Sequence, residues 1–239
     1  MKIMTFNLKD DGLKLFSNWK KRLYGFAKLI TYENPDIIGT QEMTYKAKKL
    51  LEKLLIQNNL HYTFYGESRK RNNMIFDEYN CILVKDNIKV LSSFTYALSN
   101  TPLKPKTKFI NDKFPRIMTY IETEDFYVYN THLTNKVTEN KFLQLECITN
   151  LIKKNKPIIM TGDFNLGDKR LKDFCAKNKL IDTTKKIGYT FSTKKPIYHL
   201  DHILVDKKIK FCDTVKHDFT YKNIYLSDHF PVTTIINLK

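Results

Sequence analysis

Residues 157–165, Pro-Ile-Ile-Met-Thr-Gly-Asp-Phe-Asn, decide the fold. The continuous apolar run from Pro157 to Thr161 is typical of a buried strand. It leads directly into Gly162-Asp163-Phe164-Asn165, in which Asp163 and Asn165 can turn to the same side of an extended segment. A turn capped by these two side chains is the alternative interpretation.

Four other apolar segments adjoin polar residues in the same way. The run from Ile3 to Phe6 is followed by Asn7, and Ile37-Ile38 is followed shortly by Gln41-Glu42. The run from Tyr127 to Tyr129 is followed by Asn130-Thr131-His132. Near the end of the chain, Ser227-Asp228-His229 precedes the apolar run at 232–236. A single Gln-Glu pair or strand-end histidine is more commonly structural, so the argument depends on the combination. Carboxylates, amides and imidazoles in one cleft suit metal-assisted hydrolysis. Their hard oxygen ligands favour Mg²⁺, or Mn²⁺, over zinc.

Strand and helix patterns alternate along the chain, which predicts layered α/β structure with helices packed outside sheets. The segment at 98–115 contains three prolines and little periodicity, so we expect a long loop there. The expected helices are Trp19 to Tyr32, Met43 to Gln57, Glu139 to Lys154 and Leu171 to Asn178.

The chain has 239 residues with 42% hydrophobic composition, which excludes an intrinsically disordered protein. The formal charge of +16 fits either a lysine-coated surface or attraction to polyanions such as nucleic acid. The four cysteines are scattered, so we expect reduced thiols rather than a disulfide framework or zinc ribbon. No secretory signal or membrane-spanning run is visible, so we expect a cytoplasmic protein without stable membrane insertion. We also expect a monomer.

Six motifs occur in chain order: Thr5-Phe6-Asn7, Gln41-Glu42, Asn130-Thr131-His132-Leu133, Gly162-Asp163-Phe164-Asn165, Leu200-Asp201-His202-Ile203 and Ser227-Asp228-His229-Phe230-Pro231. Together they resemble the motifs of the endonuclease/exonuclease/phosphatase superfamily, whose fold is that of DNase I. The family fold implies one α/β domain over residues 1–239, a four-layer two-sheet β-sandwich flanked by helices. Secondary matches at Trp19 to Arg22, Leu98 to Pro102 and Phe114 to Ile117 are similar to the bacterial branch with mostly unassigned substrates.

The resemblance also implies roles for individual residues. Glu42 would be the main metal ligand, with Asn7 and Asp228 beside it. Asp163 would orient and deprotonate the attacking water, and Asn165 would hold that water or a phosphate oxygen.

Two histidines would act on the phosphate. His229 would donate to a non-bridging oxygen, and Asp201 would accept a hydrogen bond from it. His132, paired with Glu78, would bind the phosphate or protonate the leaving oxygen. Substrate phosphate contacts are also expected from Arg116, Arg69 and Arg71.

Three functions remain open at this point. We rank a Mg²⁺-dependent phosphodiesterase acting on nucleic acid first, because of His132, Glu78 and the basic charge. A phosphatase or a sphingomyelinase-like phospholipid head-group hydrolase would use the same motifs. A non-catalytic binding module would have lost one of the core residues, and none is lost. The segment at 197–202 disfavours an inositol-polyphosphate 5-phosphatase, and His132 disfavours an abasic-site endonuclease.

Overall fold

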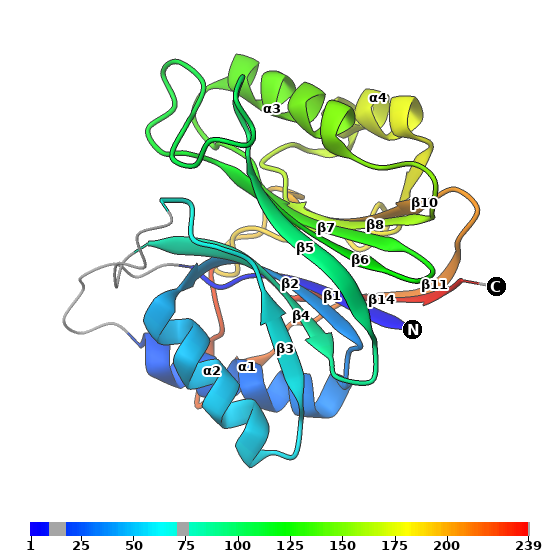
Figure 1. The fold of residues 1–239 in the computed structure, drawn as a ribbon. Coiled ribbons are helices and arrows are strands. Elements are labelled where there is room, and N and C mark those ends of the chain that lie inside the picture. Colours follow the sequence, from blue (N-terminus) through cyan, green and yellow to red (C-terminus); the bar gives the residue numbers. More distant parts are fainter. Residues whose placement is uncertain (10–17, 71–76, 239) are drawn as a thin grey trace.

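Two six-stranded mixed sheets pack face to face in the computed structural model, which describes residues 1–9, 18–70 and 77–238. The first sheet has the strand order β11-β14-β1-β2-β4-β3 and the second has the order β5-β6-β7-β8-β10-β9. Helices α1 and α2 cover the outer face of the first sheet, and α3 and α4 cover the outer face of the second (Figure 1). This arrangement confirms the predicted four-layer fold.

The bounds of the elements are as follows. The first sheet comprises β11 (Lys210–Lys216), β14 (Val232–Asn237), β1 (Lys2–Asn7), β2 (Ile37–Thr44), β4 (Glu78–Lys85) and β3 (Tyr62–Tyr65). The second comprises β5 (Val90–Ala97), β6 (Ile117–Thr123), β7 (Tyr127–His132), β8 (Ile158–Asp163), β10 (Asp201–Asp206) and β9 (Leu180–Asp182). A small hairpin joins β12 (Thr220–Tyr221) to β13 (Ile224–Tyr225). The helices are α1 (Trp19–Glu33), α2 (Tyr45–Gln57), α3 (Thr138–Leu151) and α4 (Asp168–Asn178).

Three apolar cores hold these layers together. One lies between α1, α2 and the first sheet, a second between α3, α4 and the second sheet, and a third between the two sheets. The third core uses β-branched side chains such as Ile3, Ile159 and Val232, which suit the pleated surface of a strand. Burial on both faces explains why these strands are continuous apolar runs rather than alternating ones.

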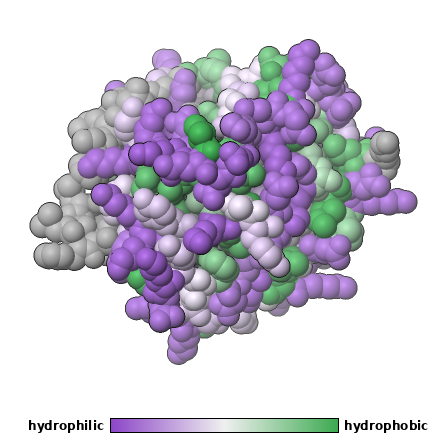
Figure 2. All heavy atoms as spheres, turned by 90° about the horizontal axis from the view of Figure 1, so that it is seen from below, coloured by the Kyte–Doolittle hydropathy of each residue, from purple (hydrophilic) through white to green (hydrophobic). Residues whose placement is uncertain are grey.

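The face of the molecule that carries α1 and α2 is largely hydrophilic. Viewed from the side of α1 and α2, hydrophilic residues dominate and the hydrophobic ones are scattered between them (Figure 2). Within the described residues, no helix is both long and apolar enough to cross a membrane.

Several predicted boundaries were wrong. The helix expected from Met43 begins at Tyr45, because Met43 and Thr44 still pair with β4 and the Thr44 side chain caps α2 by accepting from the Ala47 N–H. The sequence analysis did not predict β3, β9, β11, β12 or β13. The expected loop at 98–115 contains no helix or strand.

Candidate active site

The strand register brings the predicted site residues to one edge of the sandwich. Asn7 lies opposite Gln41 in the parallel pair β1–β2, and His132 lies opposite Asp163 in the parallel pair β7–β8. Asp201 begins the antiparallel strand β10 directly opposite Asp163. Because parallel strands end at the same edge of a sheet, residues far apart in sequence meet there, at the carboxyl end of β1 and away from the chain termini (Figure 1).

Two of these residues adopt left-handed backbone conformations. Glu42 has a φ of 55° and lies where the β2–β4 register shifts, between Thr40 and Met43. Asn165 has a φ of 50° immediately after β8. Such conformations are costly for residues with a side chain and cluster at functional sites. The bulge and the turn re-aim these two side chains into the cleft between the sheets.

Asn7 connects the two sheets at this edge. Its Nδ2 donates to Glu42 Oε1 at 3.1 Å and to Asp163 Oδ2 at 3.0 Å. Its Oδ1 accepts from the Lys9 backbone N–H at 3.0 Å. Asn165 adds a backbone N–H to Asp163 Oδ1 at 2.9 Å, so both oxygens of the Asp163 carboxylate are held in place.

His229 and Asp201 form a buried pair beside Asp163. The Asp201 Oδ2 lies 2.8 Å from His229 Nδ1, the contact that the sequence predicts. His229 Nε2 points toward Asp163 Oδ2, 3.6 Å away. Burial alone would lower the pKa of His229, but the charges of Asp201 and Asp163 outweigh it and raise the pKa to about 10. The imidazole therefore carries a positive charge at pH 7.

Asp163 itself is almost fully buried. Burial raises the pKa of Asp163 to about 6, although His229 and the Asn7 amide oppose the shift. His132 lies on the other side, with Nε2 3.5 Å from Asp163 Oδ2. Burial, together with the charges of Arg116 and His229, lowers the pKa of His132 well below its usual value. One carboxylate is thus flanked by a charged and a neutral imidazole.

The oxygen donors at this edge fit a hard divalent cation. Glu42 contributes a carboxylate to the cleft, Asp228 contributes a second, and Asn7 contributes an amide in contact with Glu42. The Lys9 ammonium now lies 2.9 Å from Asp228 Oδ2, so a cation at Asp228 would displace it. Ligation by Asn7 through oxygen would require its amide to turn, because Nδ2 faces Glu42.

Arg22, from the predicted Trp19 to Arg22 match, fixes the backbone around these ligands. Its guanidinium donates to the carbonyls of Leu8 at 2.8 Å, Lys9 at 3.0 Å and Leu226 at 3.2 Å. The first two carbonyls follow Asn7 and the third precedes Ser227-Asp228. One buried cation therefore holds both segments that carry candidate metal ligands.

The amides of Gln41 and Asn130 connect the two sheets beneath the site. Gln41 Nε2 donates to Asn130 Oδ1 at 2.7 Å, and Asn130 Nδ2 donates to the carbonyls of Thr40 and Cys81. Gly39 permits this close approach, since a Cβ there would lie 2.0 Å from Thr161 Oγ1. These polar motif residues thus belong to the support of the site.

The predicted pairing of Glu78 with His132 is wrong. Arg69 instead takes the Glu78 carboxylate in a bidentate contact, with hydrogen bonds of 2.9 and 2.6 Å, which matches the planar guanidinium to the carboxylate. His132 Nδ1 is buried and has no hydrogen-bond partner among the described residues. The third predicted phosphate contact, Arg71, lies outside the described residues, as do Asn72 and Asn73.

A cleft opens on both sides of this cluster. The larger part, here called the large lobe, has a volume of about 900 Å³, and the small lobe has about 180 Å³. Glu42 and His132 line both lobes, so they stand between them. Arg116, Arg69 and Lys113 line the small lobe. Burial lowers the pKa of Arg116, while Glu78 opposes the shift.

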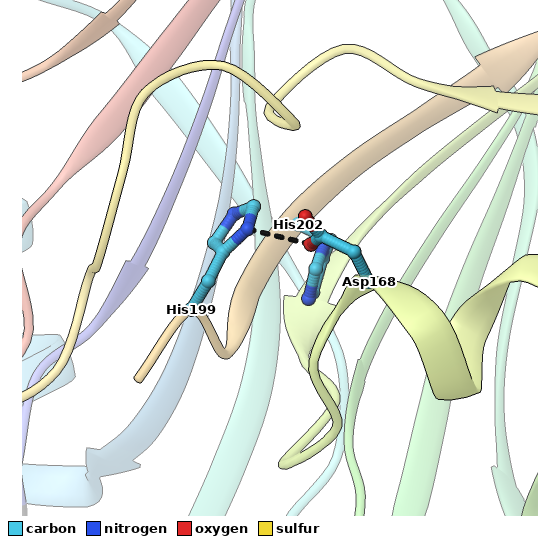
Figure 3. Close-up of side chains that lie close together, drawn as sticks. All are labelled: Asp168, His199 and His202. Atoms are coloured by element: carbon cyan, nitrogen blue, oxygen red, sulfur yellow. Dashed lines mark ion pairs between the residues drawn. The ribbon is translucent and has the colours of Figure 1, made fainter. Parts of the chain in front are cut away.

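Asp168, His199 and His202 form a second cluster of possible metal donors (Figure 3). Asp168 and His199 also line the large lobe. His199 Nδ1 lies 2.7 Å from Asp168 Oδ1. His202, however, uses both ring nitrogens, at 2.8 Å from Asp182 Oδ2 and 2.9 Å from the Leu166 carbonyl. Both acceptors require a hydrogen on the ring, so His202 is an imidazolium and unsuited to bind a cation.

The Asp182–His202 pair has a predictable effect on stability. Burial alone would lower the pKa of His202, but the Asp182 carboxylate outweighs burial and raises this pKa. For Asp182 the signs are reversed: burial alone would raise its pKa, but His202 outweighs burial and lowers it. The stabilising effect of His202 is therefore complete below about pH 6.5 and is lost as the pH rises through the pKa of His202 in the folded protein. The stabilising effect of Asp182 is complete above about pH 4 and is lost as the pH falls through the pKa of Asp182 in the folded protein.

We expect Asp182→Asn to lower the free energy of unfolding by about 3 kcal/mol at pH 5.5, because it breaks a buried pair. Urea unfolding of the wild type and the variant at pH 5.5 and 9 measures this. The difference should shrink toward pH 9, because His202 loses its proton as the pH rises through its raised folded pKa. An equal difference at both pH values would show that the ion pair does not carry the effect.

Sequence reasoning missed other residues that line the large lobe. Lys141 and Arg170 come from helices α3 and α4, and Tyr189, Phe191 and Tyr198 come from the segment between β9 and β10. No motif marks them, and helical or loop spacing alone does not reveal which helix face or loop meets the cleft. Lys141 donates from Nζ to the Asn165 carbonyl at 3.0 Å.

The model of the Endonuclease/Exonuclease/phosphatase family matches residues 4–229. The chain belongs to this family. Members of the endonuclease/exonuclease/phosphatase family are phosphoester hydrolases that generally use a divalent metal, so the protein is a phosphoric ester hydrolase. An uncharacterized protein of Acanthamoeba polyphaga mimivirus is 27% identical to it over 273 residues, which cover 98% of this chain and 99% of that protein.

Solved structures share the fold over almost the whole chain. An endonuclease/exonuclease/phosphatase from Bacteroides vulgatus has a TM-score of 0.88 at 23% identity, covering 100% of this chain and 98% of that one. A mannosyl-6-phosphatase from Bacteroides thetaiotaomicron has a TM-score of 0.85 at 22% identity, and the match covers 99% of each chain. A D. rerio TDP2 structure with a single-strand DNA product has a TM-score of 0.75 at 17% identity, and the match covers 99% of this chain and 98% of that one. At these identities the likeness shows the fold alone.

Proposed function

We propose that the protein is a divalent-metal-dependent phosphodiesterase that cleaves nucleic acid, with Mg²⁺ or Mn²⁺ as its cofactor. The observation that carries the proposal is the cleft, which extends on both sides of Glu42 and His132, with Asp163 in the large lobe. A phosphodiester has a substituent on each side of its phosphorus and needs room for both. A phosphomonoester needs only one, and the small lobe would then serve no purpose.

The charge of the two lobes supports the same proposal. Arg116, Arg69 and Lys113 line the small lobe, and Lys141 and Arg170 line the large one. The Arg116 guanidinium has no hydrogen bond to a described side chain, although most of its surface is buried. Cations on both sides of the reacting centre suit a substrate with phosphates on both sides of the scissile bond.

In this proposal Asp163 takes a proton from the attacking water, whose oxygen forms the new bond to phosphorus while the bond from phosphorus to the leaving oxygen breaks. Asn165, held by its hydrogen bond to the Leu133 carbonyl, orients that water or a phosphate oxygen. Glu42, Asn7 and Asp228 hold the cation, which when bound polarises a phosphoryl oxygen. These oxygen donors match the preference of Mg²⁺.

His229 donates from Nε2 to a non-bridging oxygen, where negative charge develops. Asp201 keeps the ring oriented by accepting from Nδ1. His132 binds the phosphate or donates to the leaving oxygen, and Arg116 contacts a phosphate from the small lobe. Glu78 acts through Arg69 rather than through His132, because it orients that guanidinium.

The test is a comparison of substrates at equal Mg²⁺. We expect the wild type to cleave supercoiled plasmid DNA or a single-stranded oligonucleotide in Mg²⁺ and to stop when EDTA is added. The products are resolved by gel electrophoresis, beside mannose 6-phosphate and a phospholipid with free-phosphate detection. Hydrolysis of only the sugar phosphate or only the lipid head group would overturn the nuclease proposal and favour the alternative hydrolases.

A further inference from the structure

The large lobe has one aromatic wall. Tyr189, Phe191 and Tyr198 lie in the segment that connects β9 to β10, and all three line the lobe. Tyr189 and Tyr198 are each 54% exposed, which is unusual for large side chains in a cleft. Backbone hydrogen bonds between Phe191 and Tyr198 form a short antiparallel bridge that fixes the wall.

The aromatic wall is attached to the reacting centre. Phe191 bridges to the backbone of His229, and the two rings have centroids 4.7 Å apart. The Phe191 and Tyr198 rings are nearly parallel, with an interplanar angle of 25° and centroids 6.5 Å apart. Phe191 therefore links the Tyr198 ring to the His229 ring. A planar group that stacks on Tyr198 would lie in the same lobe as the His229 imidazole.

Cations line the same lobe. Lys169 and Arg170 lie in the first turn of α4, and Lys141 comes from α3. A flat ring with an attached phosphate backbone matches this combination of an aromatic wall and cationic groups, since bases stack on aromatic side chains while basic residues follow the phosphates.

We propose that the large lobe binds one unpaired nucleobase against Tyr198, so that the enzyme acts on single-stranded nucleic acid in preference to a duplex. The inference rests on the proposed nuclease function and adds the strand preference to it. In a duplex each base is stacked on both faces and paired along its edge. An unpaired base can leave its neighbours and present a face to the ring.

The test uses two single-stranded substrates of equal length, one with normal nucleotides and one with tetrahydrofuran abasic units throughout. Both carry the same phosphates, and only the first has bases. We expect Tyr198→Ala to lower kcat/KM on the normal substrate by about tenfold to a hundredfold, because each base stack is lost with its aromatic partner. The abasic substrate should respond by less than twofold. Tyr198→Trp should restore most of the loss.

Tyr32→Ala is the matched control, because Tyr32 lies on α1 away from the cleft and is 84% exposed. It should cleave both substrates as the wild type does. Equal losses on both substrates in Tyr198→Ala, or a wild type that prefers duplex, would overturn the inference and leave the nuclease proposal standing. A wild type that cleaves neither substrate but hydrolyses mannose 6-phosphate would overturn both.

Discussion

Asp163→Asn is expected to lower kcat on the oligonucleotide by about a thousandfold, because an amide cannot take the proton of the attacking water. The substitution keeps the shape of the side chain and an acceptor for the Asn165 N–H. Initial rates at saturating substrate and Mg²⁺, with product resolved on a gel, measure the loss.

Asp173→Asn provides the matched control for this variant. Asp173 is an exposed aspartate on α4 and does not line either lobe. It should retain wild-type activity, and both variants should show the far-ultraviolet circular dichroism of the wild type. A folded Asp163→Asn variant within tenfold of the wild type would contradict the role of Asp163 as the base.

Glu42→Gln is expected to raise the Mg²⁺ concentration needed for half-maximal activity and to lower the rate at 1 mM Mg²⁺ by about a hundredfold, since a bound metal contributes several kcal/mol to the transition state. Gln retains an oxygen that can accept from Asn7 Nδ2. The loss should shrink as Mg²⁺ rises, because mass action refills a weakened site. A titration of activity against Mg²⁺ concentration measures the shift.

Glu52→Gln, on the exposed side of α2 where Glu52 pairs with Lys49, is the control with the same change of charge. It should follow the wild-type titration curve. If Glu42→Gln lost activity equally at every Mg²⁺ concentration, Glu42 would act in the chemical step and would not hold the metal.

The buried strands and the polar residues at their ends could be predicted from local patterns, whereas the four-layer arrangement and the roles of individual residues were implied by the family resemblance. Apolar runs such as 158–161 form buried strands, and the polar residues that follow them reach one edge through strand register. The hydrogen bond between Asp201 and His229 follows from the same motifs, as does the face of His202, which alternates away from Asp201 along β10.

The remaining features depend on tertiary contacts. The helix start at Met43 was wrong because pairing with β4 extends β2 through a bulge, which no local preference reveals. The predicted pairing of Glu78 with His132 was wrong because the Glu78 carboxylate is bound by Arg69, which lies nine residues earlier in the chain. The aromatic wall at Tyr189 and Tyr198 comes from a connecting segment whose position is set by its bridge to His229.

The most direct test of this account is the position of Mn²⁺ in a crystal of the wild type, located by anomalous diffraction. We predict an anomalous peak beside the Glu42 carboxylate, which contacts the Asn7 amide and lines the cleft together with Asp163 and Asp228. Absence of a peak beside Glu42, or an ion bound at Asp168 and His199 instead, would contradict the assignment of the metal and of the active site.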